Sequence, residues 1–210
     1  MTARDEQPVV VVIDDDALVR EAVSDLLRTV GLQSKLFASV PDFLKWERPD
    51  APCCLVLDVR LPGLSGLDFQ SELNKGDTQI PIVFMTAHGD IPMSVRAMKS
   101  GAVDFLPKPF RDQDLIDAVQ LGLEQDRKKR TGTHAAQHVK SAFDGLTVRE
   151  KEIMNFVAAG LMNKQIAGKM GVTVVTVKFH RANVMRKMGA KSVAELVRMV
   201  DALGTGRSEK

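Results

Sequence analysis

The chain has 210 residues and a mass near 23.0 kDa, which allows one large domain or two small ones. Hydrophobic residues make up 44% and charged residues 27%, so the composition excludes an intrinsically disordered chain. The net charge of +2 is unevenly divided: residues 1–125 have 12 basic and 20 acidic side chains, a net −8, and residues 126–210 have 17 and 7, a net +10. We therefore expect two domains, of which the basic one is the candidate for binding nucleic-acid phosphates.

Two further features of the sequence bear on where in the cell the protein is located. No apolar run approaches the length of about 18 residues that a membrane-spanning helix needs, and no leader with the pattern of an export signal precedes residue 10. The only cysteines, Cys53 and Cys54, are adjacent and provide neither a disulfide framework nor a metal quartet. The sequence thus predicts a cytoplasmic protein without membrane contact.

Short apolar runs alternate with amphipathic stretches in the first half of the chain. The runs lie at 9–13, near Phe37, and at 55–57, 82–85 and 103–106. The stretches between and after them have helical spacing, and two of them end at Gly31 and Gly101, where helix C-caps are expected. Apolar strands without polar alternation are buried on both faces. This pattern predicts an α/β fold, a doubly wound five-stranded parallel sheet.

Polar residues lie at or just after the carboxyl ends of most of these strands. Parallel sheets bind their ligands at these ends. In chain order the polar residues are Asp14, Asp15, Asp16, Asp58, Thr86 and Lys108. For Asp16 we favour a helix cap. Carboxylates that converge from two strands need a cation, and oxygen ligands suit Mg²⁺, with Mn²⁺ as an alternative. With Lys108 and Thr86 added, the set predicts a site that places a phosphoryl group on an aspartate.

Four strings in this half resemble the CheY-like receiver domain of bacterial two-component response regulators over residues 8–125. They are VVIDDD at 11–16, LDVRLPGLSG at 57–66, MTAHGD at 85–90 and FLPKPF at 105–110. The resemblance implies that Asp58 accepts phosphate from a sensor histidine kinase. It implies that Asp15, Asp58 and the backbone carbonyl of Arg60 ligate Mg²⁺, that Asp14 reaches the ion through water, and that the Lys108–Pro109 bond is cis.

The resemblance also implies a switch. Thr86 would turn toward the new phosphoryl group, and the aromatic side chain of Phe105 would rotate into the space that Thr86 leaves. Arg60 and His88 would flank the phosphoryl group and tune its hydrolysis. Enzymatic activity would be limited to Mg²⁺-dependent autophosphorylation from a phosphodonor and slow autodephosphorylation.

The second half begins after a polar stretch at 126–143, which we interpret as a linker that extends the preceding helix. Thr147 and Glu150 have the spacing of a capping box, and helices are expected from there to Gly160, over 164–170, 174–188 and 192–203. The last helix either closes the core of this domain or forms a dimer seam. No acidic residue occurs between positions 153 and 194, which hold seven basic ones.

Two helices around a break at 171–173 favour helix-turn-helix geometry, with the helix over 174–188 in the major groove. At 100° per residue, Val177, Val184 and Met188 form its core face, and Arg181 lies near the core edge. Arg181 is therefore expected to reach a phosphate or a neighbouring subunit. Residues on the opposite face would contact DNA: Lys178, Phe179, Ala182 and Arg186.

This half resembles the LuxR/GerE-type DNA-binding domain over about 144–203. The strings are LTVRE at 146–150, GLMNKQIA at 160–167 and TVKFHRANVMRKM at 176–188. The DNA-contacting set on this resemblance is Lys164, Thr176, Lys178, Phe179, His180, Arg181, Ala182 and Arg186. The chain as a whole is most similar to the FixJ branch, with a receiver at 1–125, a linker at 126–143 and a LuxR-type domain at 144–210.

The sequence thus predicts a DNA-binding transcriptional regulator that phosphorylation of Asp58 switches. Its expected partners are a sensor histidine kinase, double-stranded promoter DNA, a second copy of the chain after phosphorylation, and RNA polymerase. Two alternatives stay open. One is a Mg²⁺-dependent phosphohydrolase of the aspartyl-phosphate type, and the other is a module that acts through protein contacts alone and does not bind DNA.

Overall fold

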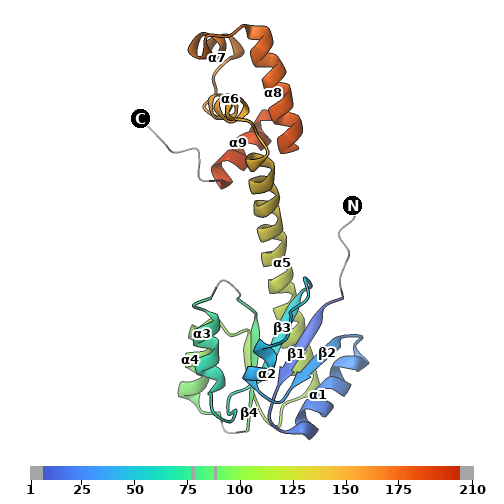
Figure 1. The fold of residues 1–210 in the computed structure, drawn as a ribbon. Coiled ribbons are helices and arrows are strands. Elements are labelled where there is room, and N and C mark those ends of the chain that lie inside the picture. The colour runs from blue at the N-terminus through green and yellow to red at the C-terminus, as the bar shows by residue number, and fades with distance from the viewer. Residues whose placement is uncertain (1–6, 77–78, 88, 204–210) are drawn as a thin grey trace. The chain divides into compact units, whose positions relative to one another are not determined.

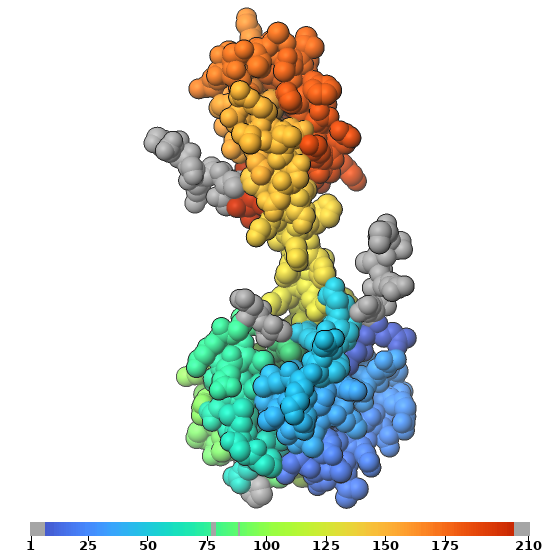
Figure 2. Space-filling model, in the orientation of Figure 1, coloured from blue at the N-terminus to red at the C-terminus, as the bar shows by residue number. Residues whose placement is uncertain are grey.

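The structure is a computed structural model that describes residues 7–76, 79–87 and 89–203. The chain divides into two units, and the division falls between Arg130 and Thr131, within the predicted linker. In the colours of Figure 2 the first unit runs from blue through green into yellow, and the second runs from yellow to red. In the described residues no helix combines the length and the apolar character that crossing a bilayer requires.

The first unit is built on one sheet (Figure 1). Its strands are β1 (Val9–Ile13), β2 (Gln33–Phe37), β3 (Cys53–Asp58), β4 (Ile82–Thr86) and β5 (Asp104–Pro107). They pair in the order β2-β1-β3-β4-β5, and every pair is parallel. All residues of β3 and β4 are buried, as expected for strands that are covered on both faces. The predicted five-stranded parallel sheet is confirmed.

Helices cover both faces of this sheet. They are α1 (Ala17–Thr29), α2 (Val40–Leu44), α3 (Gly66–Leu73), α4 (Ile91–Lys99) and α5 (Asp112–Asp144). One core contains Phe43 of α2, Phe69 of α3 and Ala97 of α4. The other contains Leu27 of α1 and Leu115 of α5. The strand order reverses between β1 and β3, so the carboxyl ends of these two strands form the crevice in which such folds bind ligands.

Residues 126–143, predicted as a linker with a helical extension, lie entirely within helix α5. No proline interrupts this helix, and ion pairs from Glu124 to Arg127 and Lys128 support it at one-turn spacing. Asp126, the first residue of that polar stretch, is buried rather than solvated. Its carboxylate accepts hydrogen bonds from Arg48 at 2.8 Å and from the backbone N–H of Cys53 at 2.9 Å.

The second unit is helical. Its helices after α5 are α6 (Val148–Ala158), α7 (Asn163–Met170), α8 (Val174–Met188) and α9 (Val193–Ala202). The predicted capping box is confirmed, because Thr147 and Glu150 each accept the other's backbone N–H. Gly171 ends α7 with φ 64°, a left-handed conformation that favours glycine and turns the chain into α8. Leu196 and Val200 of α9 are buried in this unit's core, which confirms the core-closing role of that helix.

Candidate functional site

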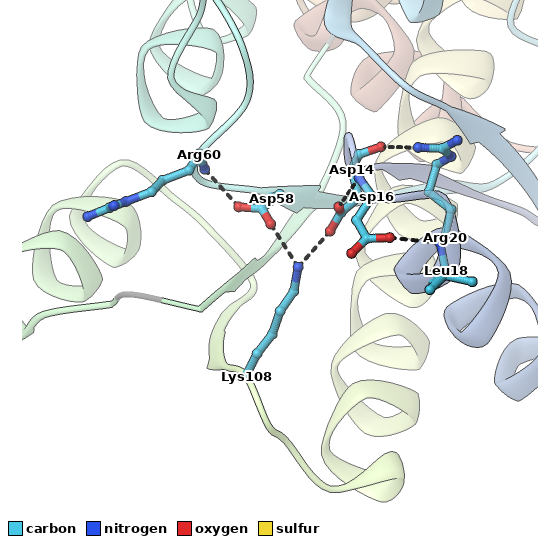
Figure 3. A network of polar contacts seen from close by, with 7 residues as sticks. All are labelled: Asp14, Asp16, Leu18, Arg20, Asp58, Arg60 and Lys108. Atoms are coloured by element: carbon cyan, nitrogen blue, oxygen red, sulfur yellow. Dashed lines mark hydrogen bonds and ion pairs between the residues drawn. The ribbon is translucent and has the colours of Figure 1, made fainter.

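Three polar side chains meet at the carboxyl edge of the sheet (Figure 3). Asp14 directly follows β1, Asp58 is the last residue of β3, and Lys108 directly follows β5. The ammonium nitrogen Nζ of Lys108 donates to Oδ2 of Asp14 at 2.6 Å and to Oδ2 of Asp58 at 2.7 Å. The fold therefore brings together residues that are 94 and 50 positions apart in the sequence.

Backbone groups hold the two carboxylates in place. The N–H of Arg60 donates to Oδ1 of Asp58 at 2.7 Å, and the N–H of Asp16 donates to Oδ1 of Asp14 at 2.9 Å. The guanidinium of Arg20 donates to the backbone oxygen of Asp14 at 2.7 Å, a contact that the sequence did not suggest. Asp16 caps α1 by accepting the N–H of Leu18, as predicted. Each oxygen of Asp58 thus has a donor, which orients the carboxylate.

Burial distinguishes the two acids. Asp14 is 1% exposed and Asp58 is 7% exposed, so an incoming group reaches Asp58 more easily. Burial raises the pKa of Asp14, although hydrogen bonds from Lys108 and from the N–H of Asp16 act in the opposite direction. Burial by itself would lower the pKa of Lys108, but its bonds to the two carboxylates raise this pKa overall. Lys108 is therefore a fixed positive charge between the two acids.

Thr86 and Phe105 lie on neighbouring strands, β4 and β5. Thr86 is fully buried, and Phe105 is half-buried with its ring centroid 6.3 Å from that of Phe84. Phe105 packs against the same core as Phe84. Because side chains alternate along β4, Thr86 points to the same face of the sheet as Phe84. The expected switch pair therefore shares one side of the sheet.

The Lys108–Pro109 bond is cis, as expected, and His88 lies outside the described residues.

The oxygen donors of this edge are of the kind that Mg²⁺ selects. Asp14 and Asp58 come from the ends of neighbouring strands, and one Lys108 nitrogen bonds to both. Asp15 is exposed and makes none of these contacts. Over the described ranges, no group of three or more His, Cys, Asp and Glu side chains is arranged to hold a metal ion. The oxygen donors are thus of the type that binds a hard cation. In this structure the ammonium of Lys108 lies between the carboxylates of Asp14 and Asp58.

The second unit exposes one face of α8. Lys178, Phe179, Ala182 and Arg186 are exposed, whereas Val177, Val184 and Met188 are buried on the opposite side. This confirms the predicted orientation of the helix. Phe179 is 64% exposed and Val175, one turn earlier on α8, is 76% exposed, so this end of the helix has apolar as well as basic surface. Lys164 of α7 is also exposed.

Other residues of the expected DNA-contacting set have partners within this unit. Arg181 is half-buried and donates to Oδ1 of Asn163 at 2.9 Å, so it joins α8 to the start of α7 instead of extending outward. Asn163 had not been singled out from the sequence. The hydroxyl of Thr176 lies 2.9 Å from that of Thr173, the N-cap of α8. His180 is half-buried, with its ring 5.7 Å from that of Phe179.

Comparison with known families agrees with this division. Residues 10–120 match the family described as response regulator receiver domain. Residues 144–200 match the family described as bacterial regulatory proteins, luxR family. The two matches favour a regulator over the phosphohydrolase and over the module without DNA binding, which were the alternatives from the sequence.

Three relatives extend over nearly the whole chain. Nodulation protein W of Bradyrhizobium diazoefficiens is 51% identical over 203 residues, which cover 97% of this chain and 89% of that protein. Transcriptional regulatory protein FixJ of Azorhizobium caulinodans is 42% identical over 198 residues and 94% of each chain. The solved structure of response regulator StyR has a TM-score of 0.85 and 47% identity, and the match covers 93% of this chain and 99% of that one.

Proposed function

Because the chain belongs to the FixJ-like response regulators, which join a receiver domain to a LuxR-type DNA-binding domain, we propose that phosphorylation of Asp58 controls its binding to promoter DNA. The family implies a histidine kinase as the partner of the first unit and DNA as the ligand of the second. The single observation that carries the proposal is the pair of bonds from Lys108 to Asp14 and Asp58 at the carboxyl edge of the sheet.

Asp58 is the better phosphate acceptor of the two bonded acids. It is the more exposed one, and the N–H of Arg60 and the ammonium of Lys108 already hold its oxygens. In the proposed step, a carboxylate oxygen of Asp58 attacks the phosphorus of the kinase's phosphohistidine. The new P–O bond forms as the P–N bond breaks, and the imidazole leaves with the electron pair. Lys108 lies where it can neutralise charge on the transferred oxygens.

We propose Mg²⁺, with Mn²⁺ as an alternative, as the cofactor of this step. Asp58, Asp15 and the backbone carbonyl of Arg60 would hold the ion directly, and Asp14 through water. Bound there, the ion would neutralise the oxygens of the phosphoryl group. Its binding requires Asp15 to turn toward the edge of the sheet, since this side chain now faces solvent. The same site would take phosphate from a small acyl phosphate and hydrolyse its own phosphoaspartate slowly.

The proposed response begins at Thr86 and Phe105. The Thr86 hydroxyl turns toward the phosphoryl group, and Phe105 rotates into the space that becomes free. We propose that the altered surface favours a homodimer, which places two copies of α8 on promoter DNA and brings RNA polymerase within reach. Lys164, Lys178 and Arg186 would contact DNA phosphates or guanine bases, and Phe179 a thymine methyl group. We place the protein in the cytoplasm, where its two buried free thiols stay reduced.

The decisive experiment incubates the full chain with acetyl phosphate and Mg²⁺ and follows phosphorylation on a phosphate-affinity gel. We expect one modified site that Asp58→Asn abolishes, while the control Asp117→Asn, an exposed position on α5, is modified as the wild type is. Equal modification of Asp58→Asn would refute the assignment. Omission of the metal tests the cofactor, since labelling should then fall sharply.

DNA binding is tested separately with selected promoter fragments, with and without the phosphodonor. We expect the phosphorylated wild type to bind more tightly than Asp58→Asn treated in the same way. Affinity should fall with rising salt concentration, because basic side chains that contact phosphates displace counterions. Affinity that does not depend on the phosphodonor would contradict the proposed control. Rapid turnover of small phosphate esters would instead favour the phosphohydrolase.

A further inference from the structure

Gly89 lies in the loop between β4 and α4, three residues after Thr86, and the structure leaves no room for a side chain there. A Cβ atom at this position would lie 2.7 Å from Cε1 of Phe105 and 2.8 Å from Cγ2 of Thr86. Cζ of the same Phe105 ring would lie at 3.1 Å. Carbon atoms in contact are ordinarily about 3.5–4.0 Å apart, so the methyl group of an alanine would overlap both side chains.

Steric space, and not backbone conformation, restricts position 89 to glycine. Gly89 is not among the described glycines with positive φ, so its backbone conformation suits any residue. Of the two neighbours, Thr86 cannot move aside easily. Thr86 is fully buried and, being β-branched, is stiff about χ1. The Phe105 ring also packs against Phe84, with the ring centroids 6.3 Å apart. The backbone of Gly89 is therefore in direct contact with both members of the switch pair.

This contact lies next to the start of α4. Asp90 is the N-cap of that helix, and its carboxylate accepts the N–H of Met93 at 2.8 Å. The other end of α4 is fastened to α3, because Gln70 and Asn74 donate to the backbone oxygen of Ser100. A displacement of Thr86 or Phe105 thus acts on the N-terminal end of α4 through a single residue, Gly89, while bonds from α3 hold the C-terminal end of the helix.

We propose that Gly89 is a positioning residue of the phosphorylation switch. Its missing side chain lets the loop rest on Thr86 and Phe105, so that a rearrangement of this pair moves the N-terminus of α4. This inference rests on the proposed function, since it deepens the mechanism by which modification of Asp58 reaches the rest of the chain.

The test compares Gly89→Ala with the wild type in full-length protein. The readout is the ratio of DNA affinities with and without acetyl phosphate, measured with the extent of phosphorylation in the same samples. We expect Gly89→Ala to be phosphorylated at Asp58 while the ratio falls about fivefold or more, the lower range of allosteric coupling. Gly168→Ala is the matched control, because a Cβ at Gly168 meets nothing within 4 Å and the ratio cancels any effect on DNA affinity itself.

Relief of the overlap provides the second measurement. Thr86→Ser removes Cγ2 and keeps the hydroxyl, and Phe105→Leu removes the ring edge. Against the Thr86→Ser/Phe105→Leu background, adding Gly89→Ala should leave the melting temperature unchanged, because the overlap is relieved. A further fall of the melting temperature in that background, or a wild-type affinity ratio in Gly89→Ala alone, would overturn the inference. The proposed function fails differently: the ratio would then be unaffected by Asp58→Asn.

Discussion

Replacing Asp126 by alanine should destabilise the first unit strongly, although the residue lies in a polar stretch far from the phosphorylation site. Its side chain is 3% exposed and binds both Arg48 and the backbone N–H of Cys53, at the start of β3. The substitution leaves a guanidinium without its carboxylate and a buried N–H without an acceptor. Nε of Arg48 is itself buried and has no hydrogen-bond partner among the described residues.

The magnitude follows from burial. Removing one partner of a buried ion pair costs about 3–5 kcal/mol, and a buried donor left without an acceptor costs about 1–3 kcal/mol. The Arg48 side chain is 17% exposed, so water can solvate part of its charge. We therefore expect Asp126→Ala to lower the free energy of unfolding by about 3 kcal/mol, the lower end of the cost for a buried pair. Domains are typically stable by about 5–15 kcal/mol, so this loss is large.

Urea denaturation of the full chain measures the effect on the first unit selectively. Trp46 is the only tryptophan, no tyrosine is present, and the indole packs against Phe37 and Phe43 of that unit. With a urea dependence of about 1–3 kcal/mol per M, the fluorescence midpoint should fall by about 1–3 M. The control is Asp117→Ala, an exposed position on the same helix. A midpoint shift no larger than the control's would refute the argument from burial.

Three other substitutions test separate parts of the molecule. Lys108→Met should leave Asp58 intact but slow its labelling by acetyl phosphate about tenfold or more, as gel assays of initial rate would show, because a preorganised charge is lost. Glu150 has its pKa lowered from 4.5 to about 2, first by the bond from Lys187. Its contribution to stability is thus complete above about pH 4.5 and is lost as the pH falls toward 2. Circular-dichroism melts should show this loss of stability at acid pH. Lys187→Met should remove most of the pH dependence and should lower the free energy of unfolding at pH 7 by about 1–2 kcal/mol. Lys178→Ala should weaken DNA binding uniformly across sequences and reduce the salt slope by about one unit in a gel-shift series, whereas an unchanged slope would exclude a phosphate contact.

Local sequence patterns were sufficient to predict the strands, the helix cap and the buried side of α8, because each depends on residues close together in the sequence. The apolar run at 9–13 became β1 with those bounds, and the run at 82–85 became β4, which extends one residue further to Thr86. Runs rich in β-branched residues and without polar alternation favour a strand that is buried on both faces. Thr147 and Glu150 predicted the start of α6, since a capping box involves only neighbouring backbone groups. The buried side of α8 followed from helical periodicity in the same way.

Contacts between distant segments could not be predicted in this manner. Asp126 was placed in a polar linker because its neighbours in sequence are charged, yet its carboxylate is buried and bonded to Arg48 and to the backbone of Cys53. Arg181 was placed near the core edge of α8 and was expected to reach a phosphate or a neighbouring subunit, but it bonds to Asn163 within the second unit. Neither pairing has a signature in the spacing of the residues involved.

What the amino-acid sequence determined alone is therefore the succession of elements and the kind of side chain at the end of each strand. Hydrogen bonding and periodicity act over a few residues, so these features can be inferred without knowing how the chain folds back. The tertiary structure decided which of those side chains touch. Lys108 joins Asp14 to Asp58 because three parallel strands end at one edge, and Gly89 is required because β4 and β5 lie side by side. Such contacts depend on distances between segments tens of residues apart, which packing of the whole domain sets.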